Sequence, residues 1–312
     1  MNPKIIFYNK FERLRSGWRF ALFLLVFIFC DGLFNFAAYT LFSKLKIDYS
    51  PGNLLFIVAN SAVSLLLVVA LGWLFGKYLE DLPFRALGCA FTKNWLRDLA
   101  WGLGLGSFTI ILAILCAIIF GGLSFEFNRD AGTSAILTTL GLSFIVFVVA
   151  AAFEEAFFRG YILQTFARAH LAWLAIVLTS LFFAAGHLNN PSANVISTLN
   201  TILAGIWFSV AYLKTRALWF PFGLHLVWNW LQGAFFGIEV SGLKNLTAAP
   251  LLQEIDRGPA WLTGADYGIE GGIAATIAII LSIVVIYLLP LLKPTEEMLA
   301  LTSEEKKAET LP

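Results

Sequence analysis

The chain has 312 residues, of which 59% are hydrophobic and only 13% are charged. Globular proteins are about half apolar and about a quarter charged, so this excess of apolar residues cannot be hidden inside one aqueous core. The composition therefore excludes an ordinary soluble domain and predicts that much of the surface faces lipid. The net charge of +1 gives no reason to expect a nucleic-acid partner.

Eight apolar segments are each long enough to form a membrane helix, which needs about 20 mostly apolar residues. The chain is thus predicted to be all-α, a polytopic helical bundle of about eight spans within residues 1–292, followed by a polar, flexible tail at 293–312. The first segment is too long for a cleaved signal peptide, so we expect it to be retained. The predicted spans are Trp18–Ser43, Asn53–Lys77, Asp98–Leu123, Thr133–Phe158, Leu171–His187, Ala193–Lys214, Leu218–Ile238 and Gly271–Leu292.

Lysine and arginine are distributed unevenly between the two ends of these spans. With the N-terminus in the cytoplasm, 16 of the 21 Lys and Arg residues fall in cytoplasmic segments and 5 in outer segments. Because positive residues concentrate in cytoplasmic loops, both termini are predicted to be cytoplasmic. We expect an integral protein of a bacterial inner (plasma) membrane, with the lipid bilayer as its constant partner.

Some small and polar residues inside the spans are expected to serve packing. Gly102 and Gly106 form a small-xxx-small step that lets helices approach closely. The Gly-x-Gly-x-Gly run around them follows no strand, which argues against a nucleotide-binding loop. Asp31 and Asn35 in the first span are expected to hydrogen-bond between helices.

An acidic pair and an arginine lie at the end of the fourth predicted span, in the sequence Glu154-Glu155-Ala-Phe-Phe-Arg159. Charged groups in lipid cost about 2.5–3.5 kcal/mol each on insertion scales, so they are candidates for function. Glu155 and Arg159 are four residues apart on a helix and are expected to pair. Glu154 points elsewhere around the helix, which leaves it as a candidate general base.

Two of the three histidines also lie in, or at the end of, apolar helices. His225 and Asn229 are four residues apart and face one side of their helix. If the fourth and fifth spans form a hairpin that turns near Leu171, Glu155 and His187 each stand about 24 Å from the turn, at one depth. We therefore predict a shared site inside the membrane. Because His225 lies close to the cytoplasmic end of its span, the site should lie nearer the cytoplasmic side.

These motifs, Glu-Glu-x-x-x-Arg, Phe-x-x-x-His from Phe183 and His-x-x-x-Asn, resemble in their order those of the CAAX protease and bacteriocin-processing family, also called the Abi family. Its eukaryotic relative is the Ras-converting CAAX endopeptidase. The resemblance runs from Glu154 to Asn229. It implies an intramembrane endopeptidase that hydrolyses a peptide bond in a membrane-associated peptide or protein. It also implies supporting roles for Glu155, Arg159 and Phe183.

The resemblance assigns catalytic roles to four residues. Glu154 matches the glutamate that activates the attacking water, and His187 matches the histidine that helps to hold or deprotonate this water. His225 and Asn229 match the pair that stabilises the tetrahedral oxyanion. Within the chain, residues 133–238 form the core that carries these motifs.

The sequence leaves the cofactor open. Glu154, His187 and His225 could supply three ligands to zinc or another divalent metal and leave a fourth position for water. The chain has no His-Glu-x-x-His helix, the common zinc motif of metalloproteases. A metal-free mechanism, in which glutamate activates the water, is equally compatible with these residues.

Two other functions are compatible with the same composition. A non-proteolytic membrane regulator or bacteriocin-immunity protein could keep the fold and bind a partner, but it has no need of buried titratable groups. An ion-coupled transporter could use the same acids as a relay. That function favours internal repeats and broken helices at matching positions, and the sequence shows no convincing repeat.

Overall fold

The computed structural model describes residues 4–49 and 54–303. The described helices and strands are, in chain order, α1 (Lys4–Phe7), α2 (Ser16–Lys44), α3 (Leu54–Glu80), η1 (Phe84–Leu87), α4 (Trp95–Gly121), β1 (Leu123–Phe127), α5 (Thr133–Glu155), η2 (Ala156–Ile162), α6 (Leu163–Arg168), α7 (Ala172–Ala185), α8 (Val195–Thr215), α9 (Trp219–Trp230), η3 (Leu231–Phe235), η4 (Lys244–Leu246), β2 (Leu252–Asp256), α10 (Ala260–Thr263), η5 (Ala265–Tyr267), η6 (Ile269–Gly271), α11 (Ile273–Leu288) and α12 (Glu296–Thr302). Segments η2 and η3 are π-helical.

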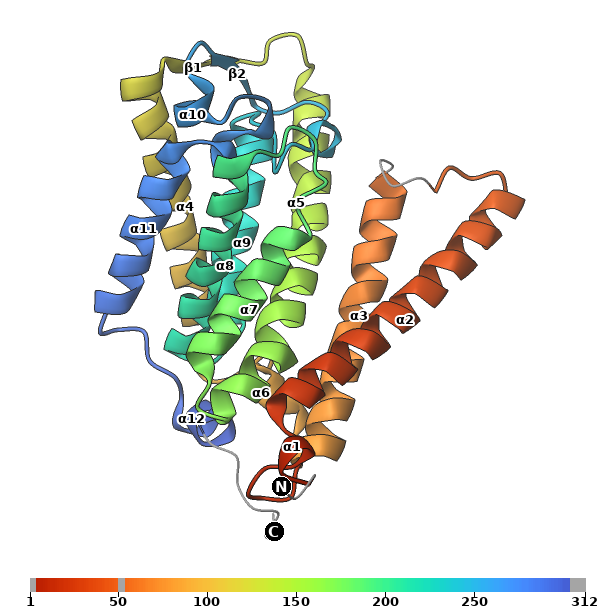
Figure 1. Ribbon diagram of the computed structural model, residues 1–312. Coiled ribbons are helices and arrows are strands. Elements are labelled where there is room, and N and C mark those ends of the chain that lie inside the picture. Colours follow the sequence, from red (N-terminus) through yellow and green to blue (C-terminus); the bar gives the residue numbers. More distant parts are fainter. Residues whose placement is uncertain (1–3, 50–53, 304–312) are drawn as a thin grey trace.

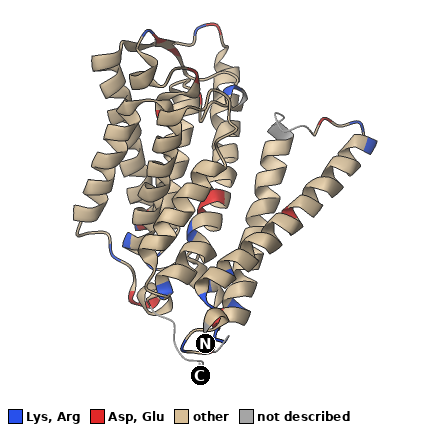
Figure 2. Ribbon diagram, viewed as in Figure 1, with Lys and Arg blue, Asp and Glu red and all other residues tan. Residues whose placement is uncertain are grey.

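The long helices form a bundle, from which α2 and α3 diverge on one side (Figure 1). Helices α1 and α12 lie at one end of the bundle, which we call the terminus face. Strands β1 and β2 lie at the opposite end, which we call the far face. Lysine and arginine gather near the terminus face, and few lie at the far face (Figure 2). The prediction of cytoplasmic termini relies on this uneven distribution of Lys and Arg between the two faces.

All eight predicted membrane segments contain helices of the structure. Within the described residues, five helices are long and apolar enough to cross a membrane, and α7 and α11 are shorter apolar helices. Many large apolar side chains are exposed, including Phe120, which is 74% exposed, and Tyr287, which is 76% exposed. Exposed apolar surface of this extent is what a lipid environment requires. The polytopic helical bundle is confirmed, while the count of eight spans and the side of the termini stay predictions.

Two regions differ from the expectation of helices followed by a flexible tail. Strands β1 and β2 pair antiparallel, from Leu123 opposite Asp256 to Phe127 opposite Leu252. Residues 296–302 of the predicted tail form helix α12, in which the Met298 side chain is buried. Both elements are held by packing against the bundle, which a short local pattern does not reveal. Residues 304–312 of the tail lie outside the described residues.

The predicted close contact at Gly102 and Gly106 is present between α4 and α9. A Cβ atom on Gly102 would lie 2.4 Å from the carbonyl oxygen of Phe220, and one on Gly106 would lie 2.8 Å from that of Leu224. The two backbones therefore touch where neither glycine can be replaced without a shift. Since α9 carries the third motif, these glycines fix its position against α4.

The predicted polar pair in the first span also serves packing. The Asn35 side chain donates to Asp31 Oδ2 within α2, and Ser64 Oγ of α3 donates to Asp31 Oδ1 over 2.6 Å. Asp31 thus joins the two helices, as the sequence predicted.

The predicted hairpin of the fourth and fifth segments is formed as well. The helix continues from α5 through η2 and α6 to Arg168, turns, and returns as α7. The backbone of Gly160 departs from helical geometry inside η2. Short π-helical stretches inside α-helices occur frequently at functional sites. This one follows directly after the acidic pair.

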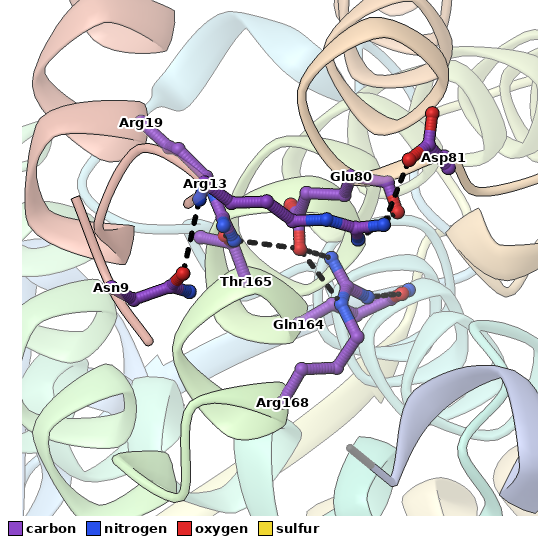
Figure 3. Close-up of polar contacts among 8 residues, drawn as sticks. All are labelled: Asn9, Arg13, Arg19, Glu80, Asp81, Gln164, Thr165 and Arg168. Carbon is purple, nitrogen blue, oxygen red and sulfur yellow. Dashed lines mark hydrogen bonds and ion pairs between the residues drawn. The ribbon is translucent and has the colours of Figure 1, made fainter. Parts of the chain in front are cut away.

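A buried ion cluster joins α2, α3 and α6 near the terminus face (Figure 3). Glu80 Oε2 lies 2.8 Å from Arg19 Nη1, and Arg168 donates to the same oxygen from Nε over 3.0 Å and from Nη2 over 2.9 Å. Arg168 also donates to the Gln164 side chain, and Arg19 donates to Thr165 Oγ1. The three charged side chains are almost completely buried. The cluster therefore fixes the α2–α3 pair to the hairpin that carries the acidic motif.

Glu254 of β2 is expected to make stability depend on pH. Burial, together with the carboxylates of Glu239 and Asp256, raises the pKa of Glu254 from its ordinary value of 4.5 to about 8. The folded protein then binds this proton more tightly than the unfolded chain. The stabilising contribution is full below about pH 4.5 and is lost as the pH rises to about 8. The thermal midpoint of Glu254→Gln in detergent should therefore rise relative to wild type over this range.

The control for this prediction is Glu126→Gln, a change at an exposed carboxylate on the partner strand. It should leave the pH profile of the thermal midpoint as in wild type. Parallel profiles for wild type and Glu254→Gln would contradict the prediction.

Candidate functional site

The motif residues lie around one cavity of about 520 Å³, a size typical of ligand sites. Glu154 comes from the end of α5, and Phe183 and His187 come from α7 and the residues that follow it. His225 and Asn229 come from α9. All five line the cavity. The sequence prediction that these residues share a site corresponds to this arrangement.

His225 lies between the two glutamates of the acidic motif. Its Nδ1 donates to Glu155 Oε1 over 2.9 Å, while its Nε2 lies 3.6 Å from Glu154 Oε2. The imidazole is buried and stacks on the Phe208 ring, with the two rings 4.6 Å apart and inclined by 14°. A carboxylate on one nitrogen and an aromatic ring on one face fix both the orientation and the tautomer of the histidine. Its second nitrogen is thereby directed toward Glu154.

Glu155 and Arg159 form the predicted ion pair, with Arg159 Nη1 3.2 Å from Glu155 Oε1. Arg159 Nη2 also donates to the carbonyl oxygen of Gly205 in α8 over 3.0 Å. The guanidinium lies over the rings of Phe158, Phe183 and Phe208, at 5.1–5.5 Å from their centres. Arg159 is completely buried. It therefore stabilises the buried Glu155 charge and holds η2 against α8 without contacting the cavity.

His187 is held by its own helix. Its Nδ1 donates to the carbonyl oxygen of Phe183 over 2.8 Å, and the two rings are 4.8 Å apart. In a neutral imidazole this leaves Nε2 as the acceptor nitrogen. Since His187 lines the same cavity as Glu154, this nitrogen is available to a polar group there.

Glu155 accepts hydrogen bonds at Oε1 from His225 and Arg159, whereas no side chain in the described structure donates a hydrogen bond to Glu154 Oε2. The Glu154 side chain is 25% exposed, and its Oε2 makes no hydrogen bond with the residues that the structure describes. A buried acceptor without a partner is costly, because it forgoes its hydrogen bonds to water. In an active site such an atom is where a water molecule or a substrate group is expected.

Sequence reasoning missed several residues that shape the site. Phe208 and Gly205 of α8 contact His225 and Arg159, and neither belongs to a motif with recognisable spacing. A Cβ atom on Gly205 would lie 2.7 Å from Ser180 Cα, so this glycine also lets α7 and α8 pack closely. Gly205 could have been found from the sequence, because small residues inside membrane spans mark close contacts between helices, the rule that identified Gly102.

The side chains do not fit the metal site that the sequence allowed. Among residues 4–49 and 54–303, no group of three or more His, Cys, Asp or Glu side chains is arranged to hold a metal ion. Glu154 and His225 approach each other, but His187 forms no hydrogen bond or ion pair with either of them in the described structure.

Comparison with known proteins gives the family of this region. Residues 136–231 match the family model described as type II CAAX prenyl endopeptidase, Rce1-like. This region is similar to the Rce1-like type II CAAX prenyl endopeptidases. The segment includes all seven residues that the motifs singled out, and the resemblance inferred from the sequence is confirmed. No curated protein matches the chain.

The Rce1-like segment extends from α5 to the first residue of η3, so it contains the hairpin, α8 and α9. These elements supply the acidic pair, both histidines and the asparagine. Helices α2, α3, α4 and α11 lie outside the segment and pack around it. The family and the apolar helices together indicate a membrane-embedded peptidase.

Proposed function

We propose that this protein is an intramembrane endopeptidase that hydrolyses a peptide bond in a membrane-associated peptide or protein, using a water molecule activated by Glu154. The observation that carries the proposal is the position of His225 between Glu154 and Glu155, at one end of a cavity lined by apolar helices. A pure scaffold has no use for a histidine that two carboxylates orient in this way.

The reaction would begin with transfer of a proton from water to Glu154. The oxygen of that water attacks the carbonyl carbon of the scissile peptide bond, and the carbonyl oxygen takes the negative charge. Glu154 then returns the proton to the amide nitrogen as the C–N bond breaks. Glu154 thus acts first as base and then as acid, so the site needs no second proton donor.

The other motif residues would bind the reacting groups. His187 Nε2 can accept a hydrogen bond from the attacking water. The Asn229 amide and a protonated His225 Nε2 can donate to the oxyanion. Donors that are fixed in advance and shielded from water stabilise developing charge more strongly than donors in water. Glu155 would hold His225 in place, and Arg159 would hold the contact between η2 and α8.

The proposal is tested with purified protein reconstituted into lipid vesicles. Candidate substrates are membrane peptides, and they include a prenylated peptide with a CAAX end, because the matched family is named for such substrates. Mass spectrometry of the products should show an internal cleavage with wild type. A variant in which Glu154, His187, His225 and Asn229 are all alanine should give none.

The alternative functions predict different results. If the four-alanine variant restores a phenotype that deletion of the protein causes, a binding or immunity role is indicated and the proteolytic function is contradicted. Uptake of an ion that depends on Glu154, without any cleavage, would indicate a transporter and would equally contradict it.

A further inference from the structure

The cavity lies toward only one end of the bundle. It extends from Glu154 and His225 to the loop after α7, at Asn190 and Pro191, and to the segment Val240–Lys244. In Figure 1 the connections after α7 and after α9 lie toward the far face, away from α1 and α12. The wall from α3 is formed by Ile57 and Ser61, which belong to the half of α3 opposite Glu80. The space around the motif residues therefore continues toward the far face.

Hydrogen bonds fix the loops at the far end of the cavity. The Glu270 carboxylate accepts from Ser241 N over 2.7 Å, from Ser241 Oγ over 2.8 Å and from Trp228 Nε1 over 3.1 Å. Asn190 Nδ2 donates to the carbonyl oxygen of Ser241. A Cβ atom on Gly242 would lie 2.0 Å from the Pro191 carbonyl oxygen, so the two loops are in direct contact. The loops at this end of the cavity are therefore held in a fixed position and are hydrogen-bonded to α9.

The opposite end of the site is closed by buried charged and aromatic side chains. Below Glu154 lie Glu155 and Arg159, which are 1% and 0% exposed, with phenylalanine rings packed on the guanidinium. Nearer the terminus face follows the buried cluster of Arg19, Glu80 and Arg168. A peptide that came from the terminus face would have to displace both layers. The far face offers the route that already exists.

The charges indicate which side of the membrane each face meets. Most of the Lys and Arg residues that the structure describes lie in the segments at the terminus face, and Figure 2 shows them gathered there. Positive residues in short loops mark the cytoplasmic side. The terminus face is then cytoplasmic, and the far face, with the cavity, is outside.

We propose that the substrate reaches Glu154 from the outer side of the membrane, so that it is a peptide segment exposed outside the cytoplasm, such as the outer part of a membrane-anchored or exported peptide. This inference rests on the proposed function of the site. It replaces the sequence-based expectation of cleavage near the cytoplasmic face. His225 lies near the middle of α9, and the space leading to it opens toward the far face.

Thiol labelling tests the direction of access without requiring activity. Cys30, Cys89 and Cys116, the three cysteines of the chain, are first replaced by alanine. Single cysteines are then introduced as Lys244→Cys at the cavity mouth and Lys93→Cys at the terminus face, both at exposed positions. A charged, membrane-impermeant thiol reagent should label Lys244→Cys only in right-side-out vesicles and Lys93→Cys only in inverted ones.

A third cysteine reports on the cavity itself. Ala204→Cys places the thiol on the cavity wall, and Leu199→Cys, on the same helix, places it on an outward apolar surface that is 59% exposed. We expect the impermeant reagent to label Ala204→Cys from the right-side-out face and to leave Leu199→Cys unlabelled from either face. Labelling of Ala204→Cys only in inverted vesicles would overturn the proposal, as would the reverse pattern for Lys244→Cys.

A cleavage assay separates this inference from the proposed function. A peptide added to the outside of right-side-out vesicles should be cleaved, and the same peptide added to inverted vesicles should not. Cleavage only in inverted vesicles would overturn the outer route while supporting the endopeptidase. Labelling from outside without cleavage of any peptide in either orientation would overturn the endopeptidase, and with it the substrate class, and would leave the direction of the cavity established.

Discussion

Replacing Glu154 by glutamine is expected to lower peptide cleavage by about 10²–10⁴-fold, the range that general acid–base catalysis typically supplies. Glutamine keeps the size of the side chain but cannot take a proton from water. The Glu154 Oε2 atom makes no hydrogen bond with the described residues and lies 3.6 Å from His225 Nε2, so the change removes this charge contact but no hydrogen bond of that oxygen. Cleavage of a reconstituted peptide substrate, with the rate measured by mass spectrometry, checks the prediction.

Two further variants test whether the loss of activity is specific to the Glu154 carboxylate. Glu126→Gln removes an exposed carboxylate on β1 and should cleave like wild type. Glu155→Gln should also lose activity, because Glu155 orients His225, but it should in addition lower the thermal midpoint, since Arg159 stays buried without its carboxylate. Equal cleavage by wild type and Glu154→Gln would remove Glu154 as the base.

The sequence was sufficient to predict the positions of the helices, because each is a long apolar segment and lipid leaves few alternatives to a helix. It also predicted that Glu154, His187 and His225 share a site. The reason is energetic: so few ionisable groups are tolerated in a span that those present have a common purpose. The helix that continues past Arg159 was required by the hairpin argument and is present.

The finer structure of the site depends on contacts between helices that are distant in sequence. The π-helical turns at η2 and η3 follow no local pattern in Ala156–Ile162 or Leu231–Phe235. The partners of Arg159 and His225 in α8, Gly205 and Phe208, are fixed by how closely α8 approaches. No spacing rule within one segment selects them.

Glu155 also shows that sequence spacing predicts contacts within one helix but not contacts between helices. The spacing of four residues predicted its pairing with Arg159, which the structure contains. It gave no indication that the same Oε1 atom also accepts a hydrogen bond from His225, 70 positions later in the chain. The local rule finds the partner on the same helix, and only the packing of α9 against α5 reveals the second one.

Replacing Glu80 by glutamine is expected to destabilise the protein by about 3–5 kcal/mol, because removing one partner from a buried ion pair leaves uncompensated charge. Here Glu80 Oε2 is the shared acceptor for Arg19 and Arg168, and all three side chains are almost completely buried. The cluster connects α2, α3 and α6, so its loss should loosen the α2–α3 pair from the rest of the bundle. Denaturation in detergent, with the thermal midpoint and the denaturant midpoint measured in the same micelle, checks the prediction.

The neighbouring residue provides a matched control. Asp81 pairs with Arg13 over 2.7 Å, but its side chain is 58% exposed. Ion pairs that are partly exposed contribute about 0–1 kcal/mol, and Arg13, although only 11% exposed, keeps its hydrogen bond to the Glu80 carbonyl oxygen when the pair is lost. Asp81→Asn should therefore leave the midpoints near those of wild type, although the same charge is removed one position away. If Glu80→Gln and Asp81→Asn shift the midpoints equally, burial does not set the strength of this cluster.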